Sequence, residues 1–135
     1  MNMAEELYNE GFISYPRTET DHFDTLKDDE LKQLIEHQCD SHVWGEYAQT
    51  LLSGGKYKRP KRGGHDDKAH PPIHPIKFSS SHAREQTPKW RLYEMIVRHF
   101  LACCSEDGLG WETIITGQIA SEVFKCSGLV IEERN

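Results

Sequence analysis

The residues best suited to chemistry lie in the segment Ile13–Thr20, where Tyr15 stands two positions before Arg17. A tyrosine side chain is a phenol with a pKa near 10, so about one in a thousand is ionised at neutral pH. A neighbouring guanidinium favours the phenolate and can also bind a phosphodiester oxygen. Pro16 fixes its own φ and favours an extended Tyr15, which gives the two side chains a defined spacing. These residues are therefore suited to attack on a phosphate.

Tyr-Pro-Arg is also common in ordinary surface turns, and the neighbouring sequence favours the functional interpretation. The run Gly11–Thr20 resembles the signature G-x-I-[ST]-Y-x-R-[ST]-[DE] of type IA DNA topoisomerases, and Ala4–Tyr8 resembles the A-x-x-L-Y helix before it. The block Lys68–Pro75 resembles the family's A-H-x-A-I-x-P, and Arg91–Ala102 resembles the helix that follows. The blocks occur in family order and cover nearly the whole chain.

Two details are most similar to the eukaryotic topoisomerase III branch, alpha type. They are the Pro-Pro-Ile-His-Pro form of residues 71–75 and the run Phe100–Ser105. Bacterial members often carry small residues in place of Pro71 and Pro72, and an arginine in place of His74. The role of that arginine is therefore not carried over to His74.

The resemblance implies a role for each matching residue. Tyr15 would attack a DNA phosphodiester and become joined to the 5′ phosphate, while Arg17 would stabilise charge on that phosphate. Thr18 and His70 would contact DNA phosphate. The alternatives are that Thr18 caps a turn through its side-chain oxygen and that His70 is an ordinary surface histidine.

The resemblance also implies a larger enzyme. Type IA topoisomerases cut one DNA strand, pass another through the gap and reseal it without ATP. Their Mg²⁺ is held by an acidic Toprim domain that these 135 residues lack. We therefore expect a piece of a larger protein that is inactive alone and belongs to a nuclear enzyme of DNA repair and recombination. The family's partners are a RecQ-type helicase and an OB-fold accessory protein.

The charge distribution is uneven, although the net charge is −6. Residues 1–50 carry 3 basic and 12 acidic side chains, residues 51–100 carry 11 and 4, and residues 101–135 carry 2 and 6. The middle third is thus a candidate for binding anions, because the local field matters more than the total. We call its densest part the basic cluster: Lys56, Lys58, Arg59, Lys61 and Arg62. The last four are predicted to contact DNA phosphates, and a solvated charged loop is the alternative.

Composition is that of one polar domain, with 36% hydrophobic residues and a mean hydropathy of −0.71. No apolar run approaches the roughly 20 residues of a membrane span, and the acidic N-terminus is unlike a signal peptide. The four cysteines form no C-x-x-C pair, which favours buried free thiols and a reducing compartment.

The hydrophobic pattern predicts a mainly α (α+β) fold. Asn2, with Glu5 as a capping box, would begin a first helix that Gly11 ends. Two further helices are expected within residues 25–54, and a stronger one after the cap Thr87-Pro88. Trp44 and Trp90 are assigned to the core.

The remaining residues predict irregular and extended structure. Residues 55–86 show no periodicity and read as a long basic loop. Three short strands are expected at Thr113–Ile119, Val123–Cys126 and Leu129–Ile131. We expect residues 1–111 to form the helical domain with the tyrosine, and residues 112–135 to begin the family's arch domain.

Two alternatives remain open. One is a noncatalytic module that binds single-stranded nucleic acid or another protein. The other is a small metal-stabilised domain with ligands among His65, Asp66, Asp67, His70 and His74. The polyproline-like Pro71-Pro72 disfavours convergence of the last two histidines, since it separates them by about 12 Å at ~3.1 Å per residue. No metal is therefore expected on this chain.

Overall fold

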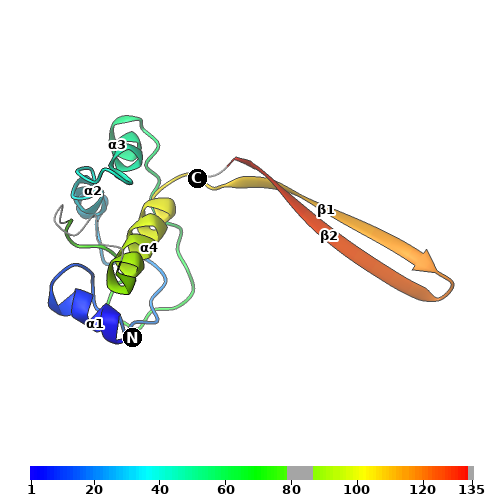
Figure 1. The fold of residues 1–135 in the computed structure, drawn as a ribbon, viewed down its shortest axis with the longest axis horizontal. Coiled ribbons are helices and arrows are strands. Elements are labelled where there is room, and N and C mark those ends of the chain that lie inside the picture. Colours follow the sequence, from blue (N-terminus) through cyan, green and yellow to red (C-terminus); the bar gives the residue numbers. More distant parts are fainter. Residues whose placement is uncertain (79–86, 134–135) are drawn as a thin grey trace. The chain divides into compact units, whose positions relative to one another are not determined.

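The computed structural model describes residues 1–78 and 87–133, which contain four helices followed by two strands (Figure 1). The helices belong to one compact unit, Met1–Ser105, and the strands to a second, Glu106–Asn135. The elements are α1 (Asn2–Asn9), α2 (Asp28–Glu36), α3 (Gly45–Ser53), α4 (Pro88–Cys103), β1 (Leu109–Ile119) and β2 (Glu122–Glu133). The expected α+β fold is confirmed.

The longest helix, α4, supplies much of the core of the first unit. Thr87 is its N-cap and accepts a hydrogen bond from the main-chain N–H of Trp90, while Pro88 occupies the first turn, as predicted. Its buried face packs against α1 and against residues that follow α1. The buried core is made of Leu7, Phe12, Ile13, Phe23, Leu31, Ile35, Trp44, Ala48, Leu51, Trp90, Tyr93, Val97, Phe100, Leu101 and Cys104. The assignment of Trp44 and Trp90 to the core is confirmed.

Helix α1 ends as the sequence predicts but begins differently. Gly11 has a φ of 76°, a left-handed conformation that glycine adopts at little cost just after a helix. The predicted capping box is wrong, because Asn2 already lies inside the helix and no side chain caps it. Glu5 is therefore available for another contact.

The segment between α3 and α4 is irregular over its described part, residues 54–78, as expected; residues 79–86 of the predicted loop lie outside the described residues. It is nevertheless tied to the core. The N–H of Lys58 donates to the carbonyl of Cys104, and Ile13 pairs with Pro75 in an isolated antiparallel bridge. Residues of this segment therefore lie beside the segment that follows α1.

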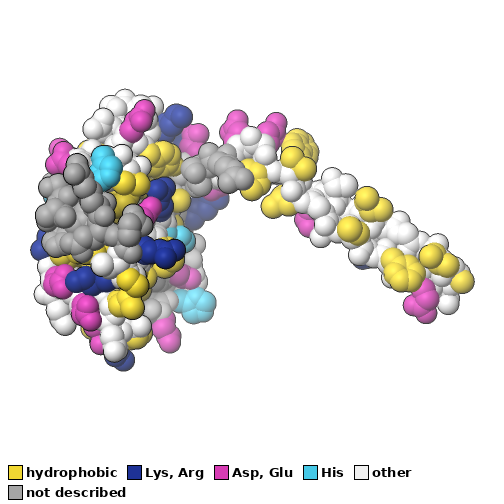
Figure 2. Space-filling view, viewed as in Figure 1, with side chains coloured by type: hydrophobic (Ala, Val, Ile, Leu, Met, Phe, Trp, Pro, Cys, Tyr) yellow, Lys and Arg dark blue, Asp and Glu magenta, His cyan; other side chains and the backbone are white. Residues whose placement is uncertain are grey.

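Strands β1 and β2 form an antiparallel hairpin with a two-residue turn at Ala120 and Ser121. The prediction of three short strands is wrong, because Ser127 and Gly128 continue β2 rather than turning the chain. Every hairpin residue that the structure describes is exposed, and Figure 2 shows hydrophobic side chains along its surface. Cys126 is thus exposed, which corrects the expectation of buried thiols; Cys104 is buried, and Cys39 and Cys103 are half-buried. Among the described helices, none is long and apolar enough to cross a membrane.

Candidate functional site

The segment with the predicted nucleophile is fixed by pairing with the segment around His74. The N–H of Ser14 donates to the carbonyl of His74 at 2.9 Å, and the N–H of Ile76 donates to the carbonyl of Phe12 at 2.8 Å. The Ser14 hydroxyl adds two bonds, since it donates to the Pro72 carbonyl and accepts from the N–H of His74. Two segments about sixty residues apart in the chain are thereby joined.

Tyr15 emerges from this pairing half-buried between two aromatic side chains. The ring of Tyr8 from α1 meets it edge-on at a centroid distance of 5.4 Å. The ring of His70 lies at 4.5 Å with an interplanar angle of 39°. The structure therefore places His70, which the resemblance assigns to DNA phosphate contact, against Tyr15, the predicted nucleophile.

Arg17 is exposed and pairs with Glu5 on α1. Its Nε donates to the Glu5 carboxylate at 2.8 Å, and its Nη2 donates to the same oxygen. This hydrogen bonding and the opposite charge raise the pKa of Arg17, so the guanidinium stays charged. Glu5 and Tyr8 are three residues apart on α1, so one helix face contacts both the tyrosine and its arginine.

Thr18 lies in a network of hydrogen bonds with Asp67 and Thr20. The Thr18 hydroxyl donates to Asp67 at 2.8 Å and accepts from the N–H of Thr20 at 3.1 Å. Asp67 also accepts from the N–H groups of His70 and Ala69, and these bonds lower the pKa of its carboxyl. The hydroxyl of Thr18 is thus part of a turn at this site.

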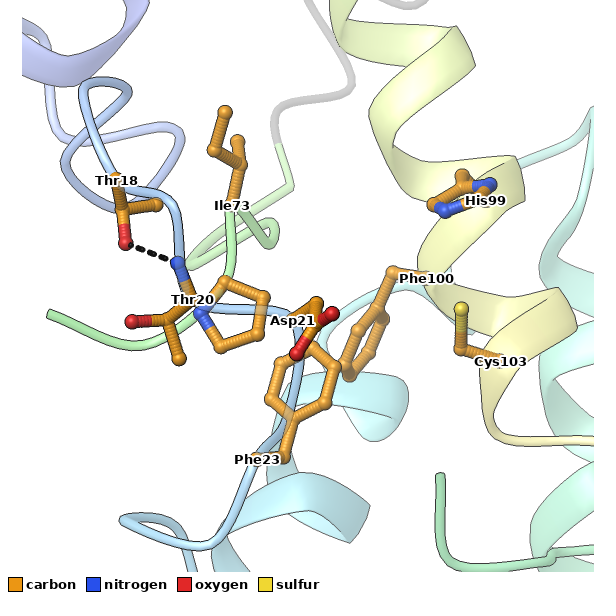
Figure 3. Close-up of a pocket in the computed structure, with 9 residues that line it drawn as sticks. Thr18, Thr20, Asp21, Phe23, Ile73, His99, Phe100 and Cys103 are labelled. Atoms are coloured by element: carbon orange, nitrogen blue, oxygen red, sulfur yellow. Dashed lines mark hydrogen bonds between the residues drawn. The ribbon is translucent and has the colours of Figure 1, made fainter. Parts of the chain in front are cut away.

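A cavity of about 330 Å³ lies beside this turn (Figure 3). Phe23 and Phe100 give it an apolar wall, with ring centroids 5.9 Å apart. Thr18, Asp21 and His99 contribute polar groups to its lining. The cavity provides space next to the segment that follows Arg17.

His74 lies behind this apolar wall rather than at the surface. Its side chain packs against Phe23 and Phe100, and its Nδ1 donates to the Pro72 carbonyl at 2.8 Å. Burial lowers the pKa of His74, so its imidazole is neutral at neutral pH. The neutral buried ring anchors His74 in the core, and the carbonyl of His74 binds the N–H of Ser14 next to Tyr15.

Part of the basic cluster forms ion pairs with the protein's own carboxylates. Arg59 pairs with Asp28 and donates to the carbonyls of Phe23 and Leu26. Arg62 pairs with Asp24 at 3.1 Å while its side chain stays largely exposed. Lys58 and Lys61 belong to the same segment, and their predicted DNA contacts stay predictions. Arg59 therefore has a structural role that its sequence position did not reveal.

No group of three or more His, Cys, Asp or Glu side chains is placed to hold a metal ion within residues 1–78 and 87–133. Asp67, one of the candidate ligands, already accepts bonds from Thr18, Ala69 and His70.

Comparison with known proteins identifies the family. The chain matches the DNA topoisomerase family over residues 1–135. It belongs to that family. Across its whole length it is 50% identical to DNA topoisomerase 3-alpha of Arabidopsis thaliana and 48% identical to DNA topoisomerase 3-alpha of Homo sapiens. It is 42% identical to DNA topoisomerase 3 of Schizosaccharomyces pombe. The predicted type IA family and its eukaryotic topoisomerase III branch are confirmed.

The chain spans 15%, 13% and 21% of the length of these three topoisomerases, respectively. Three residues that contact the predicted site residues are not assigned to this site from the sequence: Glu5, Tyr8 and Asp67. The sequence assigns Glu5 to a helix cap and Asp67 to a candidate metal site. Glu5 and Tyr8 could have been found from their i, i+3 spacing on a helix that leads directly to Tyr15. Asp67 carries a weaker signal, since an aspartate often caps a turn of the two or three residues that follow it.

Proposed function

We propose that this chain supplies the nucleophile of a type IA topoisomerase acting on single-stranded DNA. The Tyr15 oxygen loses its proton to water and attacks the phosphorus, the P–O3′ bond breaks, and the 3′ oxygen takes up a proton from water. The phosphate stays joined to Tyr15 and to the 5′ oxygen of the nucleotide that follows the break. Reversal of these steps reseals the strand without ATP, because the phosphotyrosine keeps the bond energy.

One observation carries this proposal. Tyr15 lies against His70 and two residues before Arg17, in a chain that is 42–50% identical to DNA topoisomerase 3 proteins. Arg17 uses Nε and Nη2 to bind Glu5, and a guanidinium has a further nitrogen, Nη1, that can donate to a phosphate oxygen. His70, Lys58, Lys61 and Arg62 would contact neighbouring phosphates. Thr18 already donates its one hydroxyl proton to Asp67, and Arg59 already binds Asp28.

The rest of the reaction belongs to other parts of such an enzyme. Mg²⁺ would be held by a Toprim domain and would stabilise charge on the phosphate. Residues 112–135 would begin the arch domain, and strand passage would need the remaining domains. We further propose a nuclear role in DNA repair and recombination, with a RecQ-type helicase and an OB-fold accessory protein as partners.

The test uses a chimera in which this chain replaces the matching segment of the Arabidopsis thaliana DNA topoisomerase 3-alpha. With Mg²⁺ and an end-labelled single strand, a denaturing gel detects protein joined to DNA. Tyr15→Phe keeps the ring and removes only the nucleophilic oxygen, so the adduct should disappear while DNA binding remains. An adduct that persists in Tyr15→Phe would show that another residue is the nucleophile. A noncatalytic binding module would give no adduct even before substitution.

Arg17 variants test charge stabilisation in the same assay. Arg17→Ala leaves the nucleophile, so cleavage should slow by about a hundredfold to a thousandfold rather than vanish. Arg17→Lys should recover only part of this, because an ammonium lacks the planar fork. Equal rates for Arg17→Ala and the unchanged chimera would exclude this role.

A further inference from the structure

The carboxylate of Asp67 joins the tyrosine segment to the segment that carries His70. One oxygen, Oδ2, accepts the hydroxyl proton of Thr18 at 2.8 Å. The other, Oδ1, accepts from the N–H groups of His70 at 2.8 Å and of Ala69 at 2.9 Å. The N–H of Asp67 donates in turn to the Thr20 hydroxyl at 3.0 Å. One residue thus makes four hydrogen bonds, two to each segment.

The same carboxylate fixes the backbone from which His70 projects. Lys68 has a φ of 59°, a left-handed conformation that is unfavourable for a residue with a side chain. The N–H groups of Ala69 and His70 donate to the Asp67 carboxylate. These two bonds close the turn around Lys68 and offset this strain. The ring of His70 then lies 4.5 Å from that of Tyr15.

We propose that Asp67 is a positioning residue, which sets the His70 ring against Tyr15 and fixes the orientation of the Thr18 hydroxyl. Asp67 acts through His70 and Thr18 and does not itself contact the reacting atoms. Its effect on cleavage rests on the proposed function, in which Tyr15 is the nucleophile. Its effect on the contact between the two rings is independent of that function.

The ring contact can be measured in the 135-residue chain by the NMR cross-relaxation between the ring protons of Tyr15 and His70. Asp67→Ala should abolish this signal. Asp67→Asn should keep most of it, because the carboxamide oxygen can still accept from the two N–H groups. The matched control is Asp66→Ala, which removes an equal charge one residue away and breaks a bond to the N–H of Lys68, and it should leave the signal intact.

The kinetic readout uses the topoisomerase chimera and the gel assay for the covalent adduct. Asp67→Ala should slow adduct formation at saturating oligonucleotide by roughly tenfold to a hundredfold, the usual cost of misplacing a catalytic group by about 1 Å. The half-saturating oligonucleotide concentration should change little, because the phosphate-binding cations remain. Asp67→Asn should restore most of the rate. Such a rescue would not be expected if Asp67→Ala acted only by destabilising the fold.

A persistent ring signal in folded Asp67→Ala would overturn the proposal, and so would an unchanged rate. If Asp67→Ala does not fold, Thr18→Val and Thr18→Ser replace it, since only the second keeps the hydroxyl that binds Asp67. The ring signal should then weaken in Thr18→Val and persist in Thr18→Ser, and equal signals would again overturn the proposal. Failure of the proposed function gives a different result, namely an adduct in Tyr15→Phe while Asp67→Ala still abolishes the ring signal.

Discussion

The two units of the chain are stabilised in different ways. In the first, side chains far apart in sequence form a buried core, and Phe100 and Leu101 are each 1% exposed. In the second, two strands form an antiparallel ladder with one register shift, between Leu109 and Gly110, while Trp111 and Phe124 stay 69% and 58% exposed. The proposed catalytic residues all lie in the first unit. Long-range packing is what can hold Tyr15, Arg17 and His70 in one place, and a lone hairpin cannot provide it.

The largest effect should come from removing a core side chain. Phe100→Ala should lower the free energy of unfolding of the first unit by about 3–5 kcal/mol, because it removes buried apolar surface and leaves a cavity. The matched change in the hairpin, Phe124→Ala, should alter it by no more than about 0.5 kcal/mol. Urea denaturation followed by helical circular dichroism measures both. Similar decreases would show that the hairpin ring is packed as firmly as the core.

High pH should lower the free energy of unfolding of the first unit, because two of its buried side chains, Tyr93 and Cys104, ionise there. Burial raises the pKa of Tyr93 and of Cys104 to about 12, from ordinary values of 10.0 and 9.0. The folded state therefore holds these protons more tightly than the unfolded state. The resulting stability is complete below about pH 9 and is lost as pH rises toward 12. Tyr93→Phe should make this fall shallower in denaturation curves recorded from about pH 8 to about pH 11.5, and an unchanged slope would contradict the assignment.

The N-cap of α4 should have a smaller effect. Thr87→Ala removes the oxygen that accepts from the N–H of Trp90, and it should cost about 1 kcal/mol in the same denaturation experiment. Thr87→Ser keeps an equivalent acceptor and should cost much less. If both variants are destabilised equally, the threonine contributes through packing and not through the cap.

The smallest effect concerns DNA binding by the basic cluster. The chain should bind a labelled single-stranded oligonucleotide through residues 55–91 and Arg17, with affinity that falls as salt rises, because binding releases counterions. Replacing Lys58 and Lys61 by Ala should reduce the slope of log affinity against log salt by about 0.7 for each phosphate that is no longer neutralised. Lys125→Ala, a matched charge change on the hairpin, should leave the slope unchanged. Equal slopes for all variants would remove the cluster from the binding surface.

The sequence by itself determined the local features of this protein. The spacing of Tyr15 and Arg17, the stop at Gly11 and the cap Thr87-Pro88 depend on neighbours in the chain, so they could be read before the structure was known. Periodicity predicted α4 for the same reason. Periodicity wrongly predicted a break between strands at Ser127 and Gly128, because a pair of small residues can either turn the chain or continue a strand. The pairing of these two residues with Thr113 and Ile114 shows that the strand continues.

Only the tertiary structure decided which distant groups meet. His70 is 55 positions from Tyr15, and Thr18 meets a carboxylate 49 positions away. Local sequence suggests a capping role for Glu5, whereas in the folded chain Glu5 forms an ion pair with Arg17. Arg59 likewise forms an ion pair with Asp28, which the sequence does not reveal. Charge and hydrogen-bonding capacity are properties of single residues, but the choice of partner depends on how buried segments pack, because that packing fixes the distances between side chains.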